Sequence, residues 1–346
     1  MKVLHIGGAG AIMNRFVEFI NQHFDPQDHV FLMATPSGYE MPGVSNVLNL
    51  SQYSKIRSYW QQIAWINKSE KVVLHGLFDP RLIVLLVFLP WVLKKCYWVI
   101  WGGDLYEYQL EAKDWKWRVR NFFKKIFVSK LGHFITHIKG DYDLARQWYG
   151  ARGQWHDCFM YPSNLFKDYQ FTPKPHDGIN ILLGNSATPS NNHLNAMEKL
   201  RNFANQNIRI YCPLSYGDAA YADEVARAGK DVFGDKFIAL REFLPFERYL
   251  ELLSNIDIAI FNHNRQQGLG NVTTLLGLGK KVYIRDDISS WDALVRIGVV
   301  VDNISTLNLR KIDEKLAVHN KRVVLKYFSE ENLRLCLTDI FSTVAN

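Results

Sequence analysis

The stretch "DIAIFNHNRQQGLGNVTTLLGLGKKVYI", residues 257–284, decides the fold. It begins with an apolar run of strand-forming residues, passes through polar residues into two glycines, and continues as a short helix that ends near Gly279. A second apolar run, KVYI, follows at once. A strand, a polar loop, a helix and another strand in this order are the repeating unit of a parallel α/β sheet.

The same alternation extends over the rest of the chain. Strands are predicted at residues 2–6, 29–34, 71–75, 96–101 and 133–138, and again at 179–184, 208–212, 236–240, 257–261 and 281–284. Residues 162–178, rich in proline and polar side chains, have the composition of a linker. The sequence therefore predicts two Rossmann-like α/β domains that face each other across a cleft, at 1–165 and 176–328, and a C-terminal helix at 329–346.

Composition limits the classes of function. The chain has 346 residues, 48% hydrophobic and 14% aromatic, which indicates a well-packed globular protein. Its 41 Lys and Arg outnumber 34 Asp and Glu, and this net charge of +7 favours an anionic partner. The longest apolar run, residues 82–93, is too short for a bilayer and is interpreted as a buried helix. The N-terminus enters a strand directly, so no signal peptide is expected, and the four cysteines resemble ordinary buried thiols.

Motif tests argue against several other α/β chemistries. "GGAGAI" (7–12) lacks the third glycine of a dinucleotide-binding fingerprint, and "GLGKK" (277–281) lacks the remainder of a P-loop. "DYD" (141–143) could hold a metal, but Asp141 opens a helical stretch and is expected to be its N-cap. No H-E-x-x-H or Cys/His cluster is present, so neither a metal nor a cofactor is predicted.

Four polar loops that contain glycine follow predicted strands: 74–80, 100–108, 182–193 and 262–270. An α/β domain binds its ligand at the carboxyl ends of its strands. Glycines allow a ligand to approach the backbone, and helix N-termini with Ser, Asn and Arg donors suit phosphate. Any one of these loops could be a tight turn, whereas four together favour a binding site. In a fifth loop, 212–218, Tyr216 is available either to stack on a base or to pack.

The motifs in these loops resemble a known family. They are Asn14-Arg15, "HG" at 75–76, "IWG-DLYE" around 100–107, "GD" at 140–141, "YP" at 161–162, "GNS" with "SN-H" at 184–193, and "RQQGxG" at 265–270. Over most of its length the chain resembles the enterobacterial TDP-N-acetylfucosamine:lipid II N-acetylfucosaminyltransferases, which help to build the common-antigen repeat. The resemblance implies a GT-B glycosyltransferase whose C-terminal domain binds the nucleotide sugar and whose N-terminal domain presents the acceptor.

The resemblance also implies the substrates. The donor is a TDP-linked 4-acetamido-4,6-dideoxyhexose, and the acceptor is an undecaprenyl-pyrophosphate-linked saccharide at the cytoplasmic face of the inner membrane, where the enzyme is peripheral. No nucleic-acid partner is predicted. The chain departs from the family at "WGGDLYEY" (101–108) and at "ATP" (187–189), which leaves an O-antigen enzyme or another nucleotide sugar as alternatives. A nucleotide-sugar-binding protein without catalysis is a further alternative.

Specific residues are predicted for each side of the site. The predicted donor-binding residues are Gly184, Asn185, Ser186, Asn191, His193, Tyr216, Arg265, Gln266, Gln267, Gly268 and Gly270. The predicted acceptor-side residues are Asn14, Arg15, His75, Trp101, Gly102, Asp104 and Tyr106. Charge grows on the leaving pyrophosphate during transfer, and without a metal Arg265 is expected to neutralise it, with the helix from Asn271 pointing its N-terminus at the phosphates. Asp104 is predicted to be either a catalytic carboxylate that orients the acceptor hydroxyl or a helix cap.

Residues 113–131, "KDWKWRVRNFFKKIFVSKL", are predicted to dock on an anionic membrane surface. Basic residues alternate there with aromatic ones, which is typical of a helix that lies on a membrane. The residues expected to contact the membrane are Lys116, Trp117, Arg120, Phe123 and Lys124. The alternative is a helix with a buried apolar face and a solvated basic face.

Overall fold

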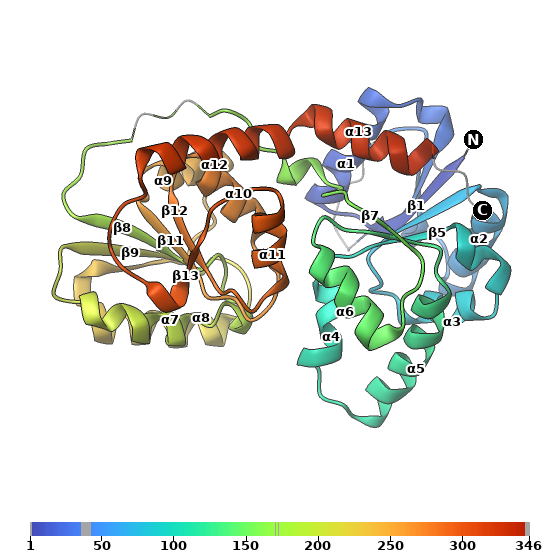
Figure 1. Ribbon diagram of the computed structural model, residues 1–346. Helices are drawn as coiled ribbons and strands as arrows, with labels where there is room; N and C mark the ends of the chain where they lie inside the picture. The colour runs from blue at the N-terminus through green and yellow to red at the C-terminus, as the bar shows by residue number, and fades with distance from the viewer. Residues whose placement is uncertain (1, 36–42, 170, 172, 343–346) are drawn as a thin grey trace. The chain divides into compact units, whose positions relative to one another are not determined.

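The computed structural model describes residues 2–35, 43–169, 171 and 173–342. The chain divides into two compact units. The N-terminal unit comprises Met1–Leu165 and Glu330–Asn346, and the C-terminal unit comprises Phe166–Ser329. Each unit is built on a parallel sheet with helices on both of its faces (Figure 1).

The sheet of the N-terminal unit is fully parallel in the order β3-β2-β1-β4-β5-β6-β7. Its strands are β1 (Val3–Gly8), β2 (His29–Ala34), β3 (Val47–Asn49), β4 (Lys71–His75), β5 (Cys96–Val99), β6 (His133–Ile135) and β7 (Gln154–His156). Leu4 of β1 lies between Val30 of β2 and Val72 of β4, and all three are buried. The strand order reverses direction between β1 and β4, which is the point where such sheets bind ligands.

In the described part of this unit, seven helices cover the sheet: α1 (Ala11–His23), α2 (Lys55–Lys68), α3 (Pro80–Val87), α4 (Gly103–Leu110), α5 (Trp115–Lys130), α6 (Lys139–Tyr149) and α13 (Glu330–Ser342). The apolar run at 82–93 is not one buried helix, as the sequence predicted. α3 ends at Val87, and a 3-10 turn, Pro90–Lys95, follows because a proline cannot continue the α-helical hydrogen bonds. Phe88 and Trp91 beside this break are exposed.

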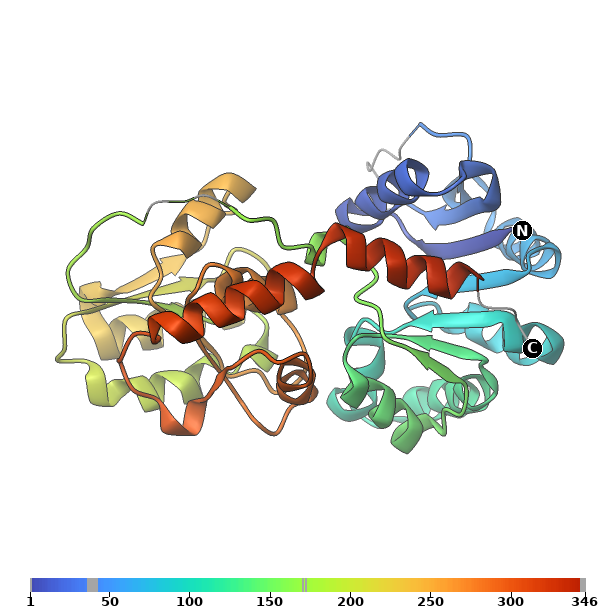
Figure 2. The same cartoon turned by 45° about the horizontal axis from the view of Figure 1, so that its top comes forward.

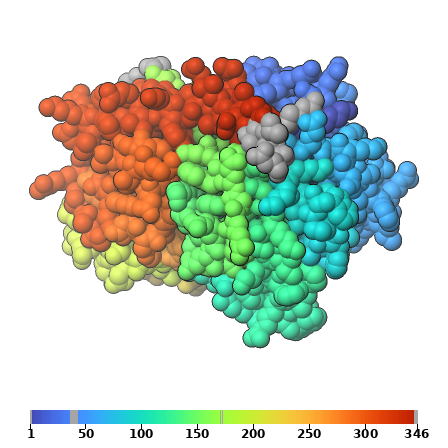
Figure 3. Space-filling model, turned by 45° about the vertical axis from the view of Figure 1, so that its right-hand side comes forward, coloured from blue at the N-terminus to red at the C-terminus, as the bar shows by residue number. Residues whose placement is uncertain are grey.

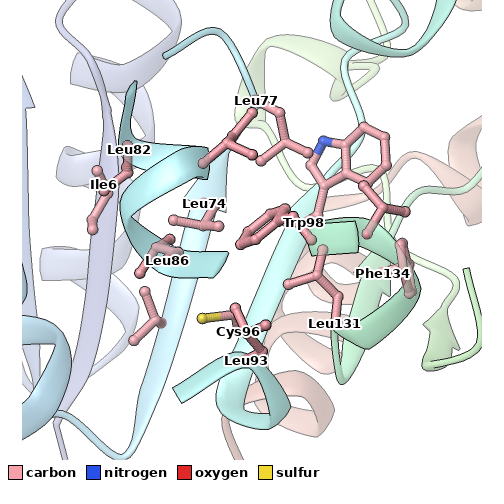
Figure 4. Packing of buried hydrophobic residues seen from close by; sticks show 14 of the residues in the cluster. Ile6, Leu74, Leu77, Leu82, Leu86, Leu93, Cys96, Trp98, Leu131 and Phe134 are labelled. Carbon is pink, nitrogen blue, oxygen red and sulfur yellow. The ribbon is translucent and has the colours of Figure 1, made fainter. Parts of the chain in front are cut away.

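The apolar core of the N-terminal unit lies between the sheet and α3 and α5. Ile6, Leu74, Leu82 and Leu86 gather beneath α3, and Trp98 packs against the same cluster (Figure 4). These side chains are almost completely buried. Parallel strands covered on both faces require such continuous apolar runs, and the runs made these strands predictable.

The C-terminal helix α13 belongs to the N-terminal unit, where it lies along the sheet (Figure 2). Lys71, at the first position of β4, is buried and donates to the carbonyl oxygens of Ile340 at 2.7 Å and Phe341 at 2.6 Å. A cation at this end satisfies the last carbonyls of the helix and complements its dipole. Burial lowers the pKa of Lys71 to about 8.

The C-terminal unit repeats the plan with strand order β10-β9-β8-β11-β12-β13, again all parallel. The strands are β8 (Ile179–Leu183), β9 (Ile208–Pro213), β10 (Phe237–Leu240), β11 (Ile258–Phe261), β12 (Lys281–Ile284) and β13 (Asp302–Asn303). The helices are α7 (His193–Leu200), α8 (Ala219–Phe233), α9 (Phe246–Ser254), α10 (Leu269–Gly277), α11 (Ser289–Arg296) and α12 (Glu314–Tyr327). Here the order reverses between β8 and β11.

Within the described part of the chain, no helix is long and apolar enough to cross a bilayer.

Candidate functional site

Two predicted donor loops meet at the switch point of the C-terminal unit. One follows β8 and the other follows β11, which are neighbouring strands. The Gly184 N–H donates to the carbonyl oxygen of Ile260 at 2.9 Å, and the Asn264 N–H donates to that of Ser190 at 2.8 Å. These backbone bonds hold the two loops together at both of their ends.

Asn191 is the centre of the polar network between these loops, and it is buried. Its Oδ1 accepts from the Asn185 N–H at 3.0 Å and lies 3.1 Å from His263 Nε2, while its Nδ2 donates to Ser186 Oγ at 3.1 Å. Because Oδ1 can only accept, His263 Nε2 must carry a proton. Burial lowers the pKa of His263 to about 3, so the ring is neutral and donates from Nε2.

Further side chains join this network through Asn185. Gln267 Nε2 donates to Asn185 Oδ1 at 3.4 Å, and Asn185 Nδ2 donates to Tyr216 Oη at 3.1 Å. Ser190 Oγ donates to Gln267 Oε1. Tyr216 is 56% exposed, so its ring is open to solvent instead of serving as core packing. Stacking of this ring on a base stays a prediction.

Two glycines bring the backbone close to this network. Gly184 has φ +70°, and a Cβ there would lie 2.4 Å from His193 Nε2. Gly268 has φ +66°, and a Cβ there would lie 3.0 Å from Asn185 Oδ1. Both conformations favour glycine, and both positions lack room for a side chain. The glycines predicted from sequence are therefore required by the geometry of the protein itself.

Helix α10 begins directly after Gly268. It starts at Leu269, two residues earlier than the predicted Asn271, and no side chain caps it among the described residues. The first N–H groups of an uncapped helix point outward and favour anions. The polar loop and the helix start therefore form one continuous set of donors.

The remaining donor-side residues lie on the same two loops. Arg265 is half-buried, and its Nη1 donates to the carbonyl oxygen of Gln266 at 2.9 Å. Gln266 precedes the start of α10, and Gly270 is the second residue of that helix. His193, the first residue of α7, is buried, and its Nδ1 lies 3.3 Å from Tyr221 Oη. Burial lowers the pKa of His193 to about 4. The proposed contact between Arg265 and a pyrophosphate stays a prediction.

In the N-terminal unit, Asp104 joins the loops that follow two neighbouring strands. Its buried carboxylate accepts from the Leu77 N–H at 2.9 Å, from the Trp98 indole at 2.7 Å and from the Trp101 N–H at 3.0 Å. The alternative that Asp104 caps α4 is wrong, because the N-cap is Gly102, with φ +83°, and makes no side-chain cap bond. Asp104 lies in the first turn of α4, and its carboxylate accepts from residues that precede the helix. Its role toward an acceptor stays a prediction.

Trp101, Tyr161 and His75 form a hydrogen-bonded chain beside Asp104. Trp101 Nε1 donates to Tyr161 Oη at 2.8 Å, and Tyr161 Oη lies 2.7 Å from His75 Nδ1. The chain continues into the core, where His75 Nε2 lies 3.1 Å from His5 Nδ1, and His5 Nε2 lies 3.1 Å from His29 Nδ1. Sequence reasoning did not assign Tyr161 or His5 to the site. The "YP" motif at 161–162 and a histidine inside an apolar strand were the available signals.

The other acceptor-side residues are more dispersed. Asn14 and Arg15 lie on α1, with Arg15 exposed, and Tyr106 Oη donates to Asp141 Oδ1 at 2.9 Å. The prediction that Asp141 is an N-cap is wrong. The N-cap of α6 is Ile138, and Asp141 is buried in the first turn, where Tyr106 uses one of its oxygens.

Helix α5 corrects part of the membrane prediction. Lys124 is buried and pairs with Glu107 and the carbonyl oxygen of Asp104, and Trp117 is buried against Tyr108. Neither can contact a surface in this fold. The exposed apolar residues are Trp115, Val119 and Phe122, whose spacing places them on one face of the helix.

Exposed basic residues flank this face of α5. Lys116, Arg118 and Lys125 are exposed. Arg120 is also exposed but pairs with Glu111 at 2.6 Å. Phe123 is only half-exposed. The start of α5 projects from the lower edge of the N-terminal unit (Figures 1 and 3). The helix thus has an outward apolar stripe with cations on both sides, although the residues differ from those predicted.

Comparison with known proteins identifies related chains. A family model described as 4-alpha-L-fucosyltransferase, glycosyl transferase group 56, matches residues 10–337. A glycosyltransferase structure from Rickettsia africae ESF-5 superimposes with a TM-score of 0.66 at 11% identity, covering 98% of both chains. Anabaena HepE in complex with UDP and glucose gives a TM-score of 0.68 at 9% identity, covering 99% of both. Sucrose-phosphate synthase from Thermosynechococcus elongatus gives 0.62 at 10% identity, covering 99% of this chain and 98% of that one. These likenesses establish the GT-B fold predicted from the sequence.

Proposed function

Because the chain belongs to the 4-alpha-L-fucosyltransferase family, glycosyltransferase group 56, we propose that it transfers a 4-acetamido-4,6-dideoxyhexose of the N-acetylfucosamine type. The proposed donor is a TDP-sugar, and the proposed acceptor is an undecaprenyl-pyrophosphate-linked saccharide of a bacterial surface polysaccharide. The reaction is that of a hexosyltransferase and proceeds without a metal.

The donor-side network is the observation that carries the proposal. Asn185, Asn191 and Gln267 present amides at the switch point of the C-terminal unit, next to the uncapped start of α10. Amides donate and accept at once, which suits sugar hydroxyls and an acetamido group, and the helix start suits a diphosphate. We assign Arg265 the charge that grows on the leaving pyrophosphate, since its planar guanidinium can bind two oxygens together.

We assign acceptor binding to the N-terminal unit. Asp104 holds the loops after β4 and β5 in one arrangement, and Trp101 and His75 are fixed through Tyr161. In this assignment Asp104 orients the residues around the acceptor hydroxyl. A rigid arrangement of this kind lowers the barrier by holding the reacting groups in the required geometry.

We place the enzyme at the cytoplasmic face of the inner membrane as a peripheral protein. The supporting feature is the exposed stripe of Trp115, Val119 and Phe122 on α5 with Lys116 and Arg118 beside it. Helices of this pattern lie in the interface of anionic bilayers. A lipid-linked acceptor would make such an attachment useful, because it brings both substrates to one surface.

The test is a transfer assay. Purified protein is incubated with TDP-, UDP- and GDP-sugars, a short-chain polyprenyl-diphosphate-linked saccharide and EDTA, and the product is measured by mass spectrometry. Transfer from the TDP-4-acetamido-4,6-dideoxyhexose alone is expected, and it should be lost in Arg265→Ala. Transfer from a UDP-sugar instead would support the alternative donor. Binding of TDP, measured as thermal stabilisation, without any transfer would support the binding protein without catalysis.

A further inference from the structure

The N-terminal unit contains a cavity of about 550 Å³ at the carboxyl ends of β1, β2 and β4, between α2 and α3. Its size lies within the range of roughly 300–1,000 Å³ that small-ligand sites have. Of the predicted site residues, only His75 lines it. The cavity therefore touches the candidate acceptor site without having been assigned to it.

The deep end of the cavity is apolar. Its walls include the edges of Ile6, Leu50, Leu77, Leu82 and Ile83, each 5–7% exposed. Figure 4 shows Ile6, Leu77 and Leu82 among the packed apolar side chains. Protein interiors are close-packed, and large apolar cavities stay dry and take up apolar molecules. The deep end thus suits a hydrocarbon chain.

The mouth of the cavity is polar and carries one available positive charge. The exposed Asp79 caps α3 by accepting from the Arg81 N–H at 2.9 Å, and it also accepts from Tyr59 Oη at 3.0 Å. The exposed Lys55, by contrast, has no ion-pair partner in the part of the chain that is described. The carboxylate is therefore already satisfied, and Lys55 favours an anionic group at the mouth.

The chain segment that supplies most of the cavity lining is basic. Residues 51–130 contain fourteen Lys and Arg against six Asp and Glu, so this segment holds all of the net positive charge of the chain. Phe78 stands 61% exposed at the cavity mouth, and Ile56 and Trp60 are exposed one turn apart on α2. An apolar cavity inside a basic, aromatic surface matches a molecule that is apolar at one end and anionic at the other.

We propose that this cavity binds the apolar chain of an anionic amphiphile, with Lys55 at its phosphate. The amphiphile is the acceptor of the proposed function, on which this inference rests, and the bound part is the isoprenoid chain nearest the phosphates. His75, at the carboxyl end of β4, also lines the cavity, which connects it to the candidate acceptor site.

Farnesyl diphosphate below its micellar concentration is the probe, and its binding is measured by calorimetry without any sugar donor. Ser58 lines the cavity from α2 and is half-buried, so Ser58→Trp fills the cavity from its rim. We expect at least tenfold weaker binding. Ala64→Trp, at an exposed position of the same helix, should stay within twofold of the parent. If Ser58→Trp loses its circular dichroism signal, Ser58→Leu replaces it with a smaller side chain and the same expected direction.

The headgroup is tested separately. Lys55→Glu should weaken farnesyl diphosphate at least fivefold and leave farnesol unchanged, and Lys68→Glu at the far end of α2 should change neither. Equal affinities of the parent for inorganic pyrophosphate and farnesyl diphosphate would overturn the proposal, as would unchanged binding in the filled variants. Binding that depends on Ser58 in a protein that transfers no sugar would refute the proposed function alone. Transfer with an unchanged acceptor KM and unchanged probe binding in Ser58→Trp would refute this inference alone.

Discussion

The phenolic oxygen of Tyr161 lies 2.7 Å from His75 Nδ1. The same oxygen accepts from the Trp101 indole at 2.8 Å, so one hydroxyl joins the loop after β4 to the loop after β5. All three residues are buried or half-buried, which makes the loss of either bond costly. This oxygen fixes the relative position of two side chains at the candidate acceptor site.

Removal of that oxygen should weaken acceptor binding. In Tyr161→Phe two buried polar groups lose their shared partner, which costs about 1–3 kcal/mol of stability. We expect a lower melting temperature and a raised acceptor KM with an unchanged donor KM. Tyr142→Phe is the control, since it removes a hydroxyl that donates to the Gly153 carbonyl elsewhere in the unit. If both variants raise the acceptor KM equally, Tyr161 has no special role there.

The N-terminal unit should be sensitive to acid. Burial lowers the pKa of five of its histidines: to about 3 for His75, to about 4 for His29, His133 and His156, and well below the ordinary value for His5. Below pH 6.5 these histidines bind protons in the unfolded chain but stay neutral in the folded unit. The free energy of unfolding is therefore at its full value above pH 6.5 and falls as the pH drops toward 4. The slope is about 1.4 kcal/mol per pH unit for each histidine that is protonated only on unfolding.

Tryptophan fluorescence can measure this effect, because nine of the ten tryptophans lie within residues 1–165. Urea unfolding at pH 7.5 and pH 5 should show a lower midpoint at the acidic pH. The variant His319→Gln, at a half-buried histidine of the C-terminal unit, should leave this difference unchanged. Equal midpoints at the two pH values would show that the buried rings are protonated in the folded state.

Asp104→Asn separates positioning from proton transfer. The amide replaces an acceptor oxygen with a donor that faces other donors, so we expect a loss of stability of about 2–4 kcal/mol together with reduced activity. A purely catalytic carboxylate predicts instead a fall in kcat of about two orders of magnitude at an unchanged melting temperature. Asp313→Asn, at the exposed cap of α12, is the matched control.

Gly268→Ala should reduce TDP binding. A Cβ there meets Asn185 Oδ1 at 3.0 Å, in addition to the cost of about 1–2 kcal/mol for a left-handed conformation. Gly150→Ala, also left-handed with φ +72° and with only Ser129 Cβ 3.8 Å from the added Cβ, carries the conformational cost alone. We expect both variants to melt earlier, and only Gly268→Ala to lose the thermal stabilisation by TDP. Full stabilisation in Gly268→Ala would place the diphosphate elsewhere.

Charge reversal on α5 should abolish membrane binding. Lys116→Glu, Arg118→Glu and Lys125→Glu together remove the exposed cations beside the apolar stripe, and electrostatic attraction to anionic lipids falls by about 1 kcal/mol for each cation removed. Sedimentation with phosphatidylglycerol vesicles measures the effect. Reversal of three exposed arginines of the C-terminal unit, Arg201, Arg209 and Arg227, is the control. Equal losses in both variants would indicate a response to total charge instead of a docking helix.

The sequence predicted the central strands well and the sheet edges poorly. All ten predicted strands exist, because strands buried on both faces require long apolar runs. The short strands β3, β7 and β13 were not predicted, and each lies at the edge of its sheet, where half-exposed residues leave no apolar run. The donor loops were found because glycine and amides mark them.

The sequence predictions failed where the direction in which a side chain points, and not the residue type, decides its contacts. Lys124 and Trp117 belong to a basic, aromatic helix, yet the turn of α5 directs both inward. Tyr161 was missed because its partners His75 and Trp101 are distant in sequence. Hydrophobic periodicity and composition predict the helices and strands of a fold, whereas the partner of a single side chain depends on tertiary packing.

Helix α13 has a consequence for how the protein is made. The ribosome releases residues 1–165 long before Glu330–Ser342, although these residues complete the same unit. Until then the face of the nascent N-terminal sheet that α1 covers lacks the part contributed by α13, and Lys71 lacks the carbonyl oxygens of Ile340 and Phe341. Domains usually fold in the order of synthesis. Here the unit that emerges earlier of the two is the one completed later, and a stop codon a few turns before the end of α13 would leave it incomplete.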